Sequence, residues 1–235
     1  MAGNRSPGRS GWGTGRLVRP PTAACDDAPM EPGSGTFGRF VRHRRRTAYE
    51  NPWITVWHDD VSRPDGSPGI YGLVHFEHLA VGVVAIDDQD RIVLVGQHRY
   101  ALDEVSWEIP EGGVPNGETA LEGARRELRE ETGVEAAEWH PLAELTLSNS
   151  VTDERATLFL ATRLNHGDAS PEPTESLTVR WLPFTEALAM VLDGRITDAL
   201  SVVGIERVAL ARLPDPVPPR SEPAVSRSRP EPVSG

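Results

Sequence analysis

Three glutamates within little more than one helical turn could carry the chemistry of this chain. Glu127, Glu130 and Glu131 lie in the stretch 118–132, which is rich in Ala, Leu, Glu and Arg and ends before Gly133. At about 100° per residue, a helix places the three carboxylates on one arc beside an apolar stripe. Partly buried carboxylates repel one another, and a hard cation such as Mg²⁺ or Mn²⁺ relieves that repulsion. A solvated acidic helix face has the same spacing, so this pattern alone leaves both interpretations open.

A glycine-rich segment precedes the helix. Residues 110–117 include Gly112 and Gly113 and show no regular periodicity, so we expect a loop there. Glycine lets a backbone approach a bound group closely. A metal held by carboxylates beside such a loop suits phosphoryl or pyrophosphate chemistry. The metal neutralises phosphate oxygens, and a carboxylate can orient or deprotonate a water.

These residues must be positioned by strands and helices that the sequence also predicts. Alternating or continuous apolar stretches predict strands, and helix-forming stretches predict helices. The expected strands cover 53–58, 70–76, 80–86, 92–95, 105–109, 142–147, 156–162 and 179–183. The expected helices cover 118–132, 185–192 and 197–212. Strands interspersed with helices predict an α/β fold, with a mixed sheet between helices.

Composition limits the remaining possibilities. Of 235 residues, 38% are hydrophobic, and Gly and Pro gather at the ends. We therefore expect a folded domain at 37–213 between disordered tails at 1–36 and 214–235. The lone cysteine, Cys25, excludes an intrachain disulfide and a cysteine-based zinc site.

Charge and hydropathy bear on partners and location. The formal net charge of -11 argues against nucleic acid as the main partner, and only the arginine-rich stretch 39–46 leaves that alternative open. Because no apolar stretch approaches 18 residues, we expect no membrane span. The segment before Cys25 lacks the hydrophobic stretch of a signal sequence, so we expect a cytoplasmic protein.

The segment 112–134 resembles the Nudix box, the signature of the Nudix hydrolase family. Nine fixed positions agree: Gly112, Glu118, Arg126-Glu127-Leu128, Glu130-Glu131 and Gly133-Val134. The resemblance implies an α/β/α sandwich that hydrolyses a nucleoside diphosphate linked to another group. It also implies one to three Mg²⁺ or Mn²⁺ ions held by carboxylates of the box helix.

The resemblance implies roles for the metal-binding residues. Glu127 and Glu131 correspond to metal ligands. Glu130 corresponds to a ligand or to the base that orients the water. The main-chain carbonyl of Glu111, just before the box glycine, is a further expected ligand.

Other box positions imply supporting roles. Glu118 corresponds to a residue that supports the site by charge pairing or through outer metal contacts. Arg126 corresponds to a structural arginine that pairs with a nearby carboxylate. Gly112 and Gly113 are expected to contact the substrate.

Segments outside the box resemble the ADP-ribose and ADP-sugar pyrophosphatases. They are Trp107–Gly113, the stretch 95–100 with Arg99 as a phosphate contact, and an N-terminal antiparallel strand pair at 53–76. In this branch such a strand pair serves dimerisation and base binding, so a homodimer is implied. Glu154, in the loop 147–155, is the candidate general base, and a mobile loop would complete the site on substrate binding.

One departure keeps the substrate open. These pyrophosphatases usually carry Ser-Pro-Gly fifteen positions past the box, where this chain has Ser148-Asn149-Ser150. A nucleoside diphosphate sugar resembling ADP-ribose remains the expected substrate. The alternatives are an oxidised nucleoside triphosphate, a dinucleoside polyphosphate, or binding without cleavage by a Nudix-like sensor.

Overall fold

The computed structural model describes residues 35–167 and 177–213. The expected tails fall almost entirely outside these residues, as does a short segment within the domain. The expected domain limits of 37–213 therefore stay a prediction.

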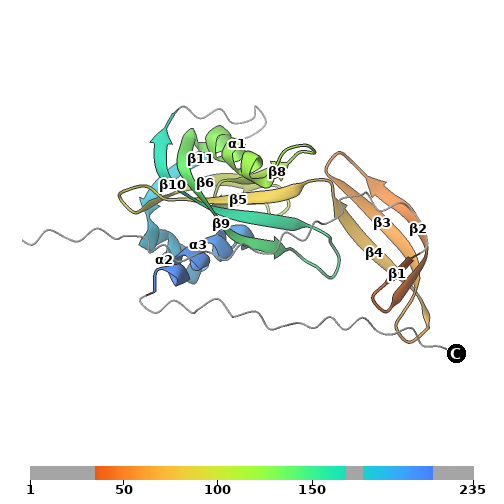
Figure 1. Cartoon of the computed structure of the whole chain (residues 1–235). Helices are drawn as coiled ribbons and strands as arrows, with labels where there is room; N and C mark the ends of the chain where they lie inside the picture. The colour runs from red at the N-terminus through yellow and green to blue at the C-terminus, as the bar shows by residue number, and fades with distance from the viewer. Residues whose placement is uncertain (1–34, 168–176, 214–235) are drawn as a thin grey trace, which may run out of the picture. The chain divides into compact units, whose positions relative to one another are not determined.

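Four antiparallel strands form an N-terminal sheet in the order β1-β2-β3-β4 (Figure 1). They are β1 (Gly35–Phe37), β2 (Phe40–Glu50), β3 (Ile54–Ser62) and β4 (Pro68–Phe76). The expected strand pair at 53–76 is confirmed as β3 and β4. The structure adds β2, which carries the arginine-rich stretch and pairs with β3. That stretch is therefore part of a sheet and not a free tail.

Two further sheets follow. A mixed sheet has the order β8-β5-β10-β9, in which only the β5 and β10 pair is parallel. Its strands are β5 (Leu79–Ala85), β8 (Glu111–Val114), β9 (Val134–Thr146) and β10 (Arg155–His166). An antiparallel sheet, ordered β11-β6-β7, contains β6 (Arg91–Arg99), β7 (Glu104–Glu108) and β11 (Thr178–Pro183).

Three helices complete the described chain: α1 (Ala120–Thr132), α2 (Phe184–Leu192) and α3 (Ala199–Ala211). Figure 1 shows α1 and α3 on opposite sides of β5. Alternation along β5 explains this arrangement, because Val81 and Val83 pack in the cluster with α1 while Val84 packs in the cluster with α2 and α3. The expected α/β/α sandwich with a mixed sheet is confirmed.

Most expected elements are present, with shifted ends. The helix expected at 118–132 begins at Ala120, because Pro115 to Glu118 form a turn in which the Glu118 amide donates to the Pro115 carbonyl at 3.2 Å. The expectation of an irregular segment at 110–117 is wrong for its first half, since residues 111–114 form β8 on the edge of β5. Within the described residues, the helices are too short or too polar to cross a membrane.

Candidate active site

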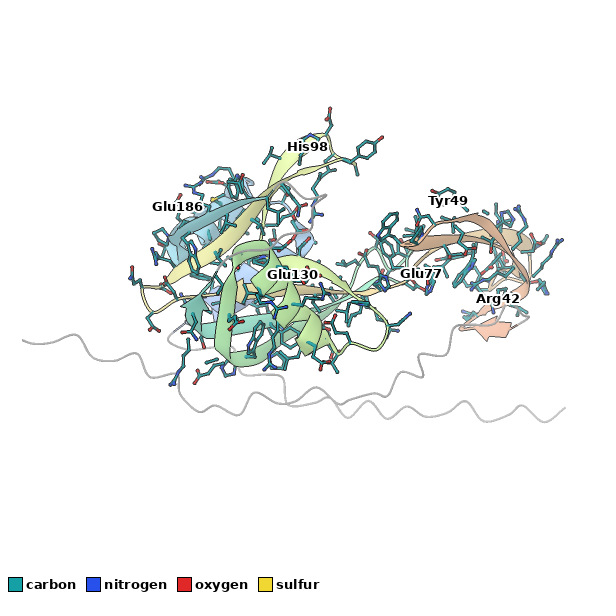
Figure 2. All side chains as sticks on the ribbon, turned by 90° about the horizontal axis from the view of Figure 1, so that it is seen from above. Arg42, Tyr49, Glu77, His98, Glu130 and Glu186 are labelled. Atoms are coloured by element: carbon teal, nitrogen blue, oxygen red, sulfur yellow. The ribbon has the colours of Figure 1, made fainter. Side chains whose placement is uncertain are left out.

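Helix α1 carries the acidic arc along the border of its buried face. Its start is fixed by a capping box, in which Thr119 accepts from the Glu122 amide and Glu122 accepts from the Thr119 amide. Gly133 ends it with a left-handed φ of 71°. Of the three glutamates, Glu131 is buried with 3% exposure, and Glu130 is partly exposed on the helix (Figure 2).

Arg126 is the hub of the carboxylate cluster. Its Nη1 donates to Glu127 Oε1 at 2.7 Å and to Glu130 Oε2 at 3.1 Å. Its Nη2 donates to Glu118 Oε2 at 3.1 Å and to the Gly113 carbonyl at 2.7 Å. Burial alone would lower the pKa of Arg126. The bonds to Glu118 and Glu127 outweigh burial, so the pKa lies above the ordinary value of arginine. One permanently charged guanidinium therefore holds three carboxylates and the loop backbone together.

Strand β8 brings the box glycine against the helix. A Cβ added to Gly112 would lie 2.2 Å from the carboxylate carbon of Glu127, so a side chain there requires displacement of that carboxylate. The amide of Glu111 donates to Glu131 Oε2 at 3.1 Å. These contacts place the main chain at 111–113 directly beside the acidic arc.

A second acidic group adjoins the first, and sequence reasoning missed two of its members. Carboxylate oxygens of Glu108, Glu111 and Asp198 all lie within 4.8 Å of one another. Arg99 pairs with Glu108 through two nitrogens and donates to Glu111 Oε1 at 2.8 Å. Burial lowers the pKa of Arg99, but its bonds to Glu108 reverse the effect and raise it.

The sequence around Glu108 and Asp198 does contain signals, but each signal concerns only its own neighbourhood. Glu108 is a carboxylate between the apolar residues Trp107 and Ile109, and Asp198 is the N-cap of α3, accepting from the Ser201 amide at 2.7 Å. Neither signal reports that the two side chains meet. A cavity of about 280 Å³ lies beside them, lined by Arg99, Ala101, Leu102, Ser106, Glu108, Glu111, Thr197 and Asp198.

The residues present fit a hard divalent cation. Three box carboxylates are gathered around one guanidinium, and Gly112 leaves no room for a side chain between backbone and Glu127. Next to them, Glu111 Oε2 is buried without a hydrogen-bond partner among the described residues. Burial, followed by repulsion from Asp198 and Glu108, raises the pKa of Glu111 well above its ordinary value. Carboxylate oxygens outnumber the positively charged side chains at this site, and oxygen atoms are the ligands that Mg²⁺ and Mn²⁺ prefer.

Glu154 lies at the end of the loop that joins β9 to β10. Its carbonyl accepts from the Leu147 amide at 3.0 Å, which closes the loop. Its side chain is partly buried, and this burial raises its pKa above the ordinary value. Two residues later, Ala156 pairs with Ala80, which pairs in turn with Gly113. Adjacent strands lie about 4.8 Å apart, so the backbones of Ala156 and Gly113 are separated by about 10 Å.

Comparisons with known proteins agree with this architecture. Residues 76–200, more than half of the chain, match the model described as "NUDIX domain". Residues 42–74 match the model described as "Nucleoside diphosphate sugar hydrolase N-terminal domain", which covers parts of β2 and β4 and all of β3.

Individual relatives match well over half of this chain. An "ADP-ribose pyrophosphatase" of Mycobacterium tuberculosis is 36% identical over 152 residues, or 63% of this chain and 72% of that protein. A "CMP-5'-(N-acetyl-N-hydroxy-3-aminopropyl)phosphonate hydrolase" of Streptomyces rubellomurinus is 27% identical over 71% of this chain and 81% of that protein. A solved structure titled "Crystal structure of ADP compounds hydrolase" superposes with a TM-score of 0.67 at 21% identity, covering 75% of this chain and 95% of that one. That last similarity concerns the fold.

Proposed function

This chain belongs to the Nudix family, and we propose that it hydrolyses the pyrophosphate linkage of a nucleoside diphosphate sugar of the ADP-ribose type. The products are a nucleoside monophosphate and a sugar phosphate. The carboxylate cluster of α1, packed on Gly112, is the observation that carries this proposal. The match of residues 42–74 to a nucleoside diphosphate sugar hydrolase domain supports the substrate class. Within this class, the similarity to the Mycobacterium tuberculosis ADP-ribose pyrophosphatase supports ADP-ribose as the first substrate to test.

A divalent cation is held by the acidic arc in this proposal. Glu127 and Glu131 are its ligands, with Glu130 and the main-chain carbonyl of Glu111 as further donors. Bound there, Mg²⁺ or Mn²⁺ supplies charge neutralisation for phosphate oxygens and activation of a water. The chain itself keeps the donors together, because Arg126 holds Glu127 and Glu130 in place.

Arg99 and the box glycines contact the substrate. The side chain of Arg99 is 37% exposed while it pairs with Glu108 and Glu111, and it lines the cavity. It can therefore donate to a phosphate oxygen without being released from its carboxylates. The backbone at Gly112 and Gly113 gives the diphosphate close access to the acidic arc.

The hydrolytic step needs a proton acceptor. A water oxygen forms a new bond to one phosphorus, the bridging P–O bond breaks, and the water's proton passes to a carboxylate. Glu154 takes this proton, or Glu130 does if it is not a metal ligand. Glu118 acts indirectly: its ion pair with Arg126 helps to hold the guanidinium that fixes the carboxylates of the arc.

A product assay over a nucleotide panel tests the substrate class. The panel contains ADP-ribose, ADP-glucose, GDP-mannose, a cytidine diphosphate compound, an oxidised dGTP and a dinucleoside polyphosphate, each with Mg²⁺ or Mn²⁺. We expect AMP from ADP-ribose to be the fastest product. Cleavage of triphosphates or polyphosphates alone would assign another substrate to the same carboxylates. Binding of ADP-ribose without any product would favour a sensor.

We also propose that the chain forms a homodimer through its N-terminal sheet. Tyr49, Trp53 and Ile70 in and beside this sheet are large apolar residues with exposed fractions of 57%, 68% and 66%. Large apolar side chains that a sheet leaves exposed are candidates for burial against a partner. The cytoplasmic location expected from the sequence stays a prediction, which fractionation of cells would test.

A further inference from the structure

The loop at 148–153 is bound to the edge of the N-terminal sheet. The amide of Val74 in β4 donates to the Val151 carbonyl at 2.9 Å, and the Asp153 amide donates to the Val74 carbonyl at 3.3 Å. Val74 and Thr152 form a parallel bridge. Strand β4 is the last strand of its sheet, so the loop occupies an edge that the sheet leaves open.

Side chains pin both halves of the loop to the same strand. Asp153 Oδ2 lies 2.6 Å from His75 Nδ1, and Asp153 Oδ1 accepts from the Phe76 amide at 3.1 Å. The hydroxyl of Tyr71 donates to the Ser150 carbonyl. Both carboxylate oxygens of Asp153 are therefore engaged by β4.

His75 is in turn supported by side chains of the N-terminal sheet. The ring of His75 stacks on Trp57 of β3 with centroids 4.7 Å apart and an interplanar angle of 12°. The Arg45 guanidinium carbon lies 3.9 Å from the centroid of the Trp57 ring, and Arg45 forms a buried ion pair with Asp59. Asp59, Arg45, Trp57 and His75 thus form a continuous series of contacts that ends at Asp153 in the loop.

We propose that Asp153 and His75 are positioning residues that hold Glu154 in place for proton transfer. Glu154 directly follows Asp153, and on its other side β10 begins at Arg155. Its backbone is therefore fixed at both ends, by the contact of Asp153 with β4 and by the strand. The inference rests on the proposed function, because it matters only if Glu154 takes the proton.

Positioning is worth a large factor in rate. A displacement of about 1 Å can cost about 100-fold in turnover. Without its bonds to β4, the loop gains conformational freedom, and ordering it again for proton transfer costs entropy. The N-terminal sheet would then contribute to turnover through a residue that touches no substrate.

The test compares turnover and loop protection in the full chain. We expect Asp153→Ala and His75→Ala to lower kcat by about 10- to 100-fold, with KM changed less than about twofold. Backbone amides at 152–153 should exchange hydrogen faster in both variants. His75→Asn keeps an N–H donor near the position of Nδ1 and should recover part of kcat. Asp60→Ala, which removes an exposed partner of His58 on β3, is the matched control and should change neither quantity.

Combining Asp153→Ala with Glu154→Gln distinguishes failure of this inference from failure of the proposed function. If Asp153 acts through Glu154, Asp153→Ala causes no further loss of kcat in the Glu154→Gln background. An equal loss in both backgrounds overturns the inference, as does an unchanged kcat in Asp153→Ala. If Glu154→Gln keeps the original kcat while Glu127→Gln does not, the inference falls and the hydrolase function stands. If both variants keep it, the proposed function itself falls.

Discussion

At the scale of single residues, Gly112 shows how closely the backbone approaches the acidic arc. Gly112→Ala would place a Cβ 2.2 Å from the Glu127 carboxylate carbon, so that carboxylate must move. We expect turnover to fall by about 100-fold, because Glu127 is a proposed metal ligand and a displacement of about 1 Å misaligns reacting groups. Steady-state kinetics checks this.

Gly72→Ala is the control for that change. An added Cβ at Gly72, in β4, meets nothing within 4 Å. This variant should keep the original turnover. Equal turnover in Gly112→Ala would show that Glu127 is not needed at its observed position.

Also at residue scale, Glu154 predicts a feature of the pH profile. Burial raises the pKa of Glu154 above its ordinary value, and the proposed general base works only when it is deprotonated. The value of kcat should therefore fall with decreasing pH through an apparent pKa above that of an exposed glutamate. Glu154→Gln should lower kcat and remove this acidic limb. An unchanged acidic limb in Glu154→Gln would assign the titration to another group.

At the scale of elements, the start of α1 rests on its capping box. Thr119→Ala removes the side-chain oxygen that accepts from the Glu122 amide and should cost about 1 kcal/mol of unfolding free energy. Thr119→Ser keeps an acceptor and should cost much less. Urea denaturation of both variants measures the difference. Equal stability of the alanine variant would mean that packing of Leu128 and Ala124 alone fixes the helix.

The elements also show what the sequence could and could not predict. Helix α1 and its acidic arc were predictable, because periodicity, the cap residues and Gly133 all lie within fifteen residues of one another. Strand β8 was missed because Gly112 and Gly113 are poor strand formers, and only pairing with β5 makes the segment extended. Local patterns do not contain such pairings.

Long-range contacts explain the remaining omissions. Glu108 and Asp198 are ninety residues apart, and their carboxylates meet only after α3 packs on the mixed sheet. The contact of Asp153 with His75 likewise joins residues 78 apart. Nothing in the neighbouring sequence of either residue indicates its partner.

At the scale of the whole molecule, the proposed homodimer predicts the mass in solution. Size-exclusion chromatography with light scattering should give twice the chain mass of 25.6 kDa. Combined Trp53→Ser and Ile70→Ser should shift the population toward monomer, because both exposed apolar side chains would otherwise be covered. A monomer at micromolar concentration in the unaltered protein would refute the dimer.

The central claim is that the carboxylates of α1 carry metal-dependent hydrolysis, and one measurement tests it most directly. The measurement is the rate of AMP release from ADP-ribose in saturating Mg²⁺ by Glu127→Gln, with the exposed α3 variant Glu206→Gln as control. We expect the rate of Glu127→Gln to fall by about 100-fold or more while the fold and the control rate are unchanged. A rate of Glu127→Gln equal to that of the unaltered protein would contradict the claim.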